Sequence, residues 1–144
     1  MPHYNKNVIP FRPSEWTFLD YVEDGQDVIE EWYESQSLET QLAFDKLLKQ
    51  NVKIKNHLEW IGRRHKMRGK GKTKIFELEF AAEDRANRIL CVFDGVMRTV
   101  MLCGCYHKNK IWYPAGALEK AERRARTVAD GTAKLKVKKI RTDR

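Results

Sequence analysis

Residues 102–110, LCGCYHKNK, combine side chains that could bind a metal or move a proton. Cys103, Cys105 and His107 stand at every second position, which could suggest a zinc site. On a strand such positions lie about 6–7 Å apart, too extended to chelate one ion easily, and no second Cys/His cluster completes four ligands. The pattern therefore predicts buried, reduced thiols without a metal. A metal or redox site is the alternative.

His107 is a candidate for acid–base chemistry because it lies where an apolar strand ends, and a strand end is a rigid platform for a site. Lys108 and Lys110 follow His107 and add positive charge. No Walker loop, HExxH or GxSxG signature is present in the sequence to indicate another kind of active site. On RNA the neighbouring 2′-hydroxyl can attack the phosphate. Basic side chains then need only orient that group, stabilise the phosphorane and protonate the 5′ oxygen. DNA lacks this hydroxyl, so such a site favours RNA.

The formal net charge of +8 is unevenly distributed along the chain. Residues 14–45 hold ten acidic side chains and no Lys or Arg, whereas residues 53–74 hold nine Lys or Arg against one acid. Residues 107–144 hold twelve Lys or Arg against four acids. Basic segments that converge on one face would attract a polyanion such as nucleic acid. The alternative is that these lysines only keep the protein in solution.

The length of 144 residues suits one domain with a core of its own. No apolar run approaches the roughly 20 residues that span a bilayer, and the N-terminus has no signal-peptide core. Cys91, Cys103 and Cys105 are an odd number of cysteines in apolar segments, which is typical of thiols in a reducing compartment. We therefore expect a cytoplasmic protein without a membrane partner.

Hydrophobic periodicity and turn signals predict an α+β domain with the order β-α-α-β-β-β-α and a mostly antiparallel sheet. Asp27 and Ser37 are expected to cap the two helices, and Asp94-Gly95 is a hairpin signal. The alternating AKLKVKK near the C-terminus is either an added edge strand or a disordered arm. The expected strands are 15–23, 74–80, 87–93 and 96–106, and the expected helices are 28–35, 38–52 and 116–128.

Four segments follow one another in a characteristic order: KMRGKGKTK before IFELEF, NRILCVFDG, VMLCGCYHKNKIWYP and the helix GALEKAERRAR. This order resembles the RelE/HigB superfamily of toxins from type II toxin–antitoxin systems, most closely its phage-derived HigB-like branch. The resemblance implies a RelE/ParE-like fold, a small twisted antiparallel sheet with two N-terminal helices packed on one face. It divides the chain into an N-terminal extension (1–14), a toxin domain (15–128) and a basic C-terminal tail (129–144).

The resemblance also implies an endoribonuclease that cleaves mRNA, generally on the ribosome, and that is silenced by an antitoxin, here expected to be a helix-turn-helix protein. No cofactor or metal is expected. Three positions depart from the family pattern: Glu79 replaces an arginine, Asn87 an aromatic residue and His107 a lysine. The implied catalytic residues are Arg88, His107 and Lys108, and the implied RNA-binding residues are Lys70, Lys72, Lys74, Tyr106, Lys110 and Arg124, with Arg123 as the alternative to Arg124.

Two other functions are compatible with the same sequence. A ParE-like protein would look similar but would poison DNA gyrase and would have no ribonuclease site. A non-catalytic phage or regulatory protein could keep the same fold and its basic, nucleic-acid-binding surface. The glutamate at position 79 favours the second alternative, because it removes a cation where the family attracts phosphate.

Overall fold

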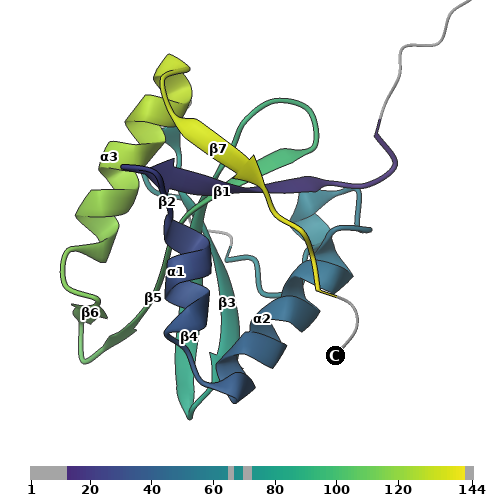
Figure 1. Cartoon of the computed structure of the whole chain (residues 1–144). Helices are drawn as coiled ribbons and strands as arrows, with labels where there is room; N and C mark the ends of the chain where they lie inside the picture. Colours follow the sequence, from purple (N-terminus) through teal and green to yellow (C-terminus); the bar gives the residue numbers. More distant parts are fainter. Residues whose placement is uncertain (1–12, 65–66, 70–72, 142–144) are drawn as a thin grey trace, which may run out of the picture.

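The computed structural model describes residues 13–64, 67–69 and 73–141. Within these ranges, one twisted sheet carries three α-helices (Figure 1). Strand order along the sheet is β2-β1-β5-β4-β3, with β6 added to β5 and β7 added to β1. The elements are β1 Thr17–Glu23, β2 Gln26–Asp27, α1 Val28–Glu34, α2 Leu38–Asn51, the 3-10 turn η1 His57–Glu59, β3 Phe76–Ala82, β4 Arg85–Phe93, β5 Arg98–Lys108, β6 Ile111–Tyr113, α3 Ala117–Asp130 and β7 Lys134–Val137.

The predicted α+β class is confirmed. Of the strand pairs, only β1 with β5 is parallel among the described residues. The short strands β2 and β6 were not predicted from the sequence, because two or three residues carry no periodic signal. Of the two alternatives for the C-terminal segment, the structure has the edge strand, β7.

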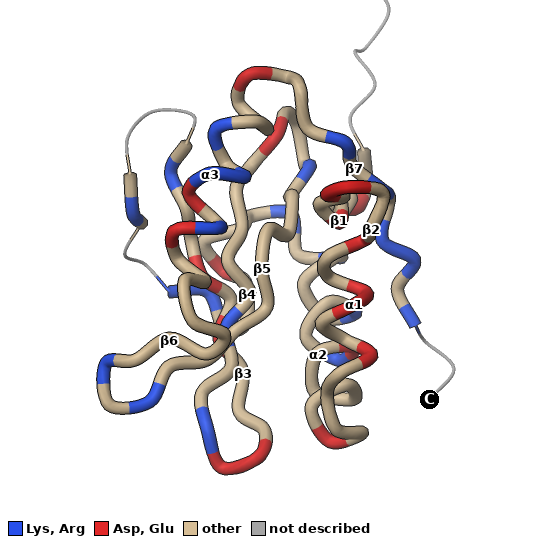
Figure 2. Tube along the Cα trace, turned by 60° about the vertical axis from the view of Figure 1, so that its left-hand side comes forward, with Lys and Arg blue, Asp and Glu red and all other residues tan. Residues whose placement is uncertain are grey.

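The two faces of the sheet have different covers (Figure 2). Helices α1 and α2 pack on one face, as predicted, where their apolar side chains meet Phe76, Leu78 and Ile89. Helix α3 packs on the other face through small residues, including Ala121 and Ala125. Alternation along β3 and β4 thus sends large apolar groups toward α1 and α2. The residues that alternate with these apolar groups along β3 and β4 face the side of α3.

Both N-terminal helices begin at the predicted caps. The Asp27 carboxylate accepts hydrogen bonds from the backbone N–H groups of Ile29 and Glu30. The Ser37 hydroxyl accepts one from the N–H of Thr40. Each cap satisfies helix donors that otherwise lack partners, which contributes about 1 kcal/mol to stability.

A β-bulge in β5 determines which face its second half presents. Leu90 pairs with Cys103, but the next residue of β4, Cys91, pairs with Met101, so Leu102 is an extra residue on β5. One extra residue exchanges the faces of every side chain beyond it. Cys103 and Cys105 therefore face the side of α3, and by the same alternation so does His107. Without the bulge, His107 would point toward α1 and α2.

The C-terminal basic segment is tied to the acidic part of the chain. Strand β7 pairs with β1, and just beyond it the buried Lys138 ammonium lies 2.7 Å from Asp20 Oδ2 and 2.8 Å from Glu30 Oε2. Arg141 Nη2 lies 2.6 Å from Glu30 Oε1. These two cations neutralise acids of the same chain and contribute correspondingly less to an attraction for nucleic acid.

Candidate active site

A cluster of charged side chains occupies the sheet face that α3 leaves uncovered. Glu77 and Glu79 alternate with the core residues of β3, and Glu79 pairs directly with Arg88 on β4. Arg88 in turn pairs with Cys105 on β5, two residues before His107. Sheet register and the bulge of β5 therefore bring these side chains to one face from three adjacent strands.

Arg88 is the centre of the cluster. Its Nε lies 3.2 Å from Glu77 Oε2, and its Nη2 donates a hydrogen bond of 3.1 Å to Glu79 Oε1. The residue is only 9% exposed, and within the described part of the chain neither Nε nor Nη1 has a hydrogen-bond acceptor. The contact of Nε with Glu77 thus has the distance of an ion pair without the geometry of a hydrogen bond. A buried guanidinium N–H without an acceptor is costly, so the Nη1 of Arg88 has an unmet hydrogen-bonding requirement.

Two further arginines reach the same carboxylates from the segment before β3. Arg64 Nη1 lies 3.1 Å from Glu79 Oε2, and Arg68 Nε lies 3.5 Å from Glu77 Oε1. Backbone hydrogen bonds fix this segment beside β3, including a mutual pair between Arg68 and Ile75 of 2.8 and 2.7 Å. Three guanidinium groups face two carboxylates, so the cluster keeps one positive charge before His107 is counted.

Gly62 allows this approach. Gly62 lies at the start of this segment, and its carbonyl oxygen accepts a hydrogen bond of 2.7 Å from the backbone N–H of Glu79. Its φ of +79° disfavours other residues, and a Cβ there would lie 2.3 Å from the Glu79 carbonyl oxygen. A side chain would therefore push Arg64 and the rest of the segment away from the carboxylates.

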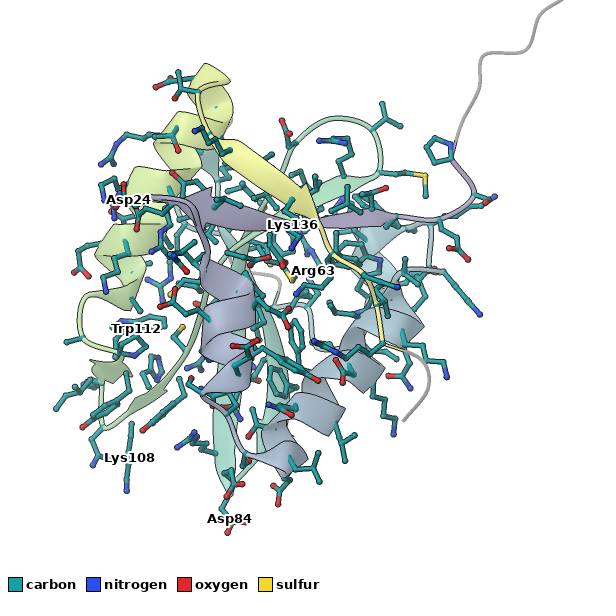
Figure 3. All side chains as sticks on the ribbon, in the orientation of Figure 1. Asp24, Arg63, Asp84, Lys108, Trp112 and Lys136 are labelled. Atoms are coloured by element: carbon teal, nitrogen blue, oxygen red, sulfur yellow. The ribbon has the colours of Figure 1, made fainter. Side chains whose placement is uncertain are left out.

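A cavity of about 260 Å³ lies among these groups and is lined by Arg64, Arg68, Glu77, Arg88 and His107. Trp112 stands beside it. Its ring meets His107 edge-to-face at 4.7 Å between centroids, and the guanidiniums of Arg68 and Arg88 lie 5.9 and 6.0 Å from its centre. Trp112 and Lys108 both come from the β5–β6 hairpin (Figure 3). The cavity can hold a phosphate-sized anion between a guanidinium, a carboxylate and an imidazole.

The residues predicted from the sequence have different surroundings. Arg88 and His107 line the cavity, whereas Lys108 and Lys110 are exposed near the tip of the hairpin. Lys74 is exposed beside β3. Lys70 and Lys72 lie outside the described residues.

Tyr106 and Arg124 are held by other side chains. The Tyr106 ring lies 3.8 Å from the Arg85 guanidinium and stacks on Tyr113. Arg124 is 7% exposed, donates to the Leu102 carbonyl at 2.7 Å and pairs with Glu23 at 2.9 Å. In this structure Arg124 joins α3 to β1 and β5, so we leave it out of the proposed RNA-binding surface.

Glu23 makes the stability of this junction dependent on pH. Hydrogen bonds from Arg123 and Arg124 hold the pKa of Glu23 at about 2, below its ordinary value of 4.5. Its ionised form therefore stabilises the fold above pH 4.5, and this contribution is lost as the pH falls toward 2. We expect Glu23→Gln to lower the free energy of unfolding at pH 7 by about 1.5–3 kcal/mol.

Urea unfolding of wild type and Glu23→Gln at pH 7 and at pH 2–3 measures this effect. The difference between the two proteins should shrink at the lower pH. Glu122→Gln, which changes an exposed carboxylate of α3, is the matched control and should leave stability nearly unchanged. Equal stability of Glu23→Gln and wild type at pH 7 would contradict the assignment.

The sequence interpretation missed Glu77, Arg64, Arg68 and Trp112 as site residues. The alternation of FELEF already placed Glu77 and Glu79 on one face. The missing step was the register of the β3–β4 hairpin, which sets Glu79 opposite Arg88. Glu79 was interpreted only as the loss of a cation, whereas in the structure it is the counter-ion of two arginines.

Cys91, Cys103 and Cys105 are buried free thiols, as predicted for core residues. Burial raises the pKa of the Cys91 thiol well above its ordinary value. Within the described ranges, no group of three or more His, Cys, Asp or Glu side chains is arranged to hold a metal ion.

Residues 36–126 match the family model described as Phage derived protein Gp49-like (DUF891). This match covers more than half of the chain. The chain belongs to the Gp49-like family. Gp49-like proteins are associated with RelE-like toxins of toxin–antitoxin systems, and the matched region contains Glu77, Arg88 and His107.

No curated protein and no solved structure matches this Gp49-like chain. Among the helices in the described ranges, none has both the length and the apolar character needed to cross a membrane.

Proposed function

We propose that this Gp49-like protein is the toxin of a type II toxin–antitoxin pair and that it cleaves mRNA as an endoribonuclease on the ribosome. It would be a RelE/HigB-like toxin of the HigB-like branch, acting in the cytoplasm. The observation that supports this proposal is the buried Arg88 guanidinium, whose Nη1 lacks an acceptor among the described residues and which lines one cavity with Glu77 and His107.

Arg88 would bind the scissile phosphate. Its guanidinium is already held by Glu77 and Glu79, so little side-chain freedom is lost when an anion binds. A planar donor group also matches phosphate oxygens and stabilises the additional charge of the phosphorane. Arg64 and Arg68 compensate the two carboxylates, so the cavity stays attractive to an anion.

Glu77 and His107 would transfer the protons. The Glu77 carboxylate accepts the proton of the 2′-hydroxyl while that oxygen forms a bond to phosphorus. The bond from phosphorus to the 5′ oxygen breaks, and His107 in its protonated form gives that oxygen a proton. The products are one RNA end with a 2′,3′-cyclic phosphate and another with a 5′-hydroxyl. The step leaves Glu77 protonated and His107 neutral, and proton exchange with water then restores both side chains.

Lysines would supply long-range attraction for the RNA backbone. Lys108 and Lys110 at the hairpin and Lys74 beside β3 are exposed and close in sequence to cavity residues. Lys70 and Lys72 complete the proposed set. Each phosphate contact adds roughly one unit to the slope of log affinity against log salt concentration. A helix-turn-helix antitoxin is the proposed protein partner.

Purified protein mixed with mRNA, with and without programmed ribosomes, tests this function. We expect cuts that leave 5′-hydroxyl and 2′,3′-cyclic phosphate ends, and none at a position where one 2′-deoxynucleotide replaces the ribonucleotide before the cut. Cuts that persist at the deoxy position would contradict the proposed nucleophile. A protein that leaves mRNA intact but arrests replication would be a ParE-like gyrase poison. One that binds RNA without either effect would be the non-catalytic alternative.

A further inference from the structure

The aromatic side chains of the β5–β6 hairpin form two pairs on opposite faces. Tyr106 pairs with Tyr113 and His107 pairs with Trp112 across the two strands. His107 lines the cavity of the candidate active site, and Trp112 stands beside that cavity. The other pair is stacked, with ring centroids 5.1 Å apart and planes 13° apart.

Tyr113 is the accessible end of this stack. The Arg85 guanidinium covers Tyr106 at 3.8 Å on one side, and Tyr113 covers it on the other. The two faces of the Tyr106 ring, which belongs to one of the RNA-binding residues that the resemblance implies, are thus covered by its neighbours. Tyr113 is 40% exposed and can offer a ring face to a ligand.

A second cavity, of about 580 Å³, lies beside Tyr113. Its walls are α1, with Glu31 and Trp32, the turn after α1, with Gln36, and α3, with Lys120 and Arg124. The Trp32 ring lies so close to β5 that a Cβ on Gly104 would be 2.3 Å from it. The cavity thus combines aromatic surfaces, an amide and an ammonium group within a volume typical of small-ligand sites.

A gap in the sheet forms the floor of this cavity. On the edge opposite β4, β5 pairs with β1 as far as Met101 and with β6 from Tyr106 onward. Residues 102–105 have no strand partner there in the part of the chain that is described. The Leu102 carbonyl accepts a hydrogen bond from Arg124, and Cys103 and Gly104 line the cavity. Backbone groups along this edge can therefore form hydrogen bonds with the polar edge of a base.

We propose that this second cavity binds a nucleobase of single-stranded RNA next to the nucleotide that is cleaved, stacked on Tyr113. The proposal rests on the proposed ribonuclease function. RNA is favoured over a peptide added to the free edge because exposed Lys108 and Lys110 near the hairpin tip and Lys120 in the wall of the cavity provide positive charge for a phosphate backbone. Aromatic stacking with cations along the backbone is the usual mode of single-strand binding.

The test uses a short RNA that is 2′-O-methylated throughout and contains one 2-aminopurine, so that it cannot be cleaved and its fluorescence is quenched when the base stacks. We expect wild type to bind and quench it. Tyr113→Leu should lose most of the quenching and weaken binding about 5- to 150-fold, the range for one base–aromatic stack. Tyr113→Phe should restore both. Ile111→Ala, an exposed apolar residue of the same strand that does not line the cavity, is the matched control and should match wild type.

The outcomes separate this inference from the ribonuclease function. Quenching by Tyr113→Leu equal to that of wild type would overturn the base site even if mRNA is cleaved normally. Quenching that depends on Tyr113 in a protein that cuts no mRNA would support the base site and reject the catalytic function. A third outcome combines two results: an antitoxin peptide releases the bound, quenched RNA, and Tyr113→Leu binds RNA as tightly as wild type does. This outcome would assign the cavity to the peptide and overturn the proposal.

Discussion

His107→Ala is expected to slow single-turnover cleavage of mRNA by about 10²–10⁴-fold, the usual cost of removing a general acid. His107 lines the cavity at the end of a rigid strand, and its ring contact among the described residues is with Trp112. Losing that contact should lower the free energy of unfolding by less than about 1.5 kcal/mol. The rate should therefore fall in a protein that is still folded.

Cleavage on programmed ribosomes and thermal unfolding of the same samples measure the two effects. Lys108→Ala is the matched control, because Lys108 follows His107 on β5 but is exposed and does not line the cavity. We expect Lys108→Ala to weaken RNA binding more than it slows the cleavage of RNA that is already bound. Unchanged single-turnover rates for His107→Ala would remove His107 from the mechanism.

Arg88→Lys should reduce the cleavage rate by about 10²–10³-fold although it keeps the positive charge. An ammonium group cannot contact Glu77, Glu79 and a phosphate with the three nitrogens that Arg88 provides. Lysine is a sharper test than alanine here, because Arg88→Ala would leave two carboxylates without their shared partner and would also destabilise the fold.

The comparison for this prediction is Arg64→Lys. Arg64 pairs with the same Glu79, but its side chain is 56% exposed, so lysine can replace it at little cost. We expect a small rate effect for Arg64→Lys and a large one for Arg88→Lys at saturating RNA. Similar rates for both variants would show that charge alone, and not the planar guanidinium, is needed at position 88.

Local patterns were enough to predict most of the fold. The caps at Asp27 and Ser37, the alternation of β3 and the turn after β4 are each encoded within a few neighbouring residues. Asp94-Gly95 indeed separates two antiparallel strands, β4 and β5. The placement of α1 and α2 on one face then follows from the apolar stripe of each helix.

The composition of the site depended on long-range geometry that local patterns do not contain. The bulge at Leu102 has no signature in its own sequence, yet it decides that His107 shares a face with Arg88. Arg64 and Arg68 reach the carboxylates only because their segment lies beside β3. Arg124 was assigned to RNA from the resemblance alone, and its partner Glu23, 101 positions away, is invisible to a local pattern.

Strand β7 has a practical consequence for work with truncated forms of this protein. The basic tail looks dispensable in the sequence, but β7 covers the outer edge of β1, and Lys138 compensates the buried Asp20. The β7 side chains Lys134 and Lys136 are exposed, and lysines on a terminal strand discourage pairing with another molecule. A chain shortened after Asp130 would instead expose the edge of the apolar strand β1, and we expect such a chain to aggregate edge to edge. The insolubility of this truncated form would therefore say nothing about a role of the tail in RNA binding.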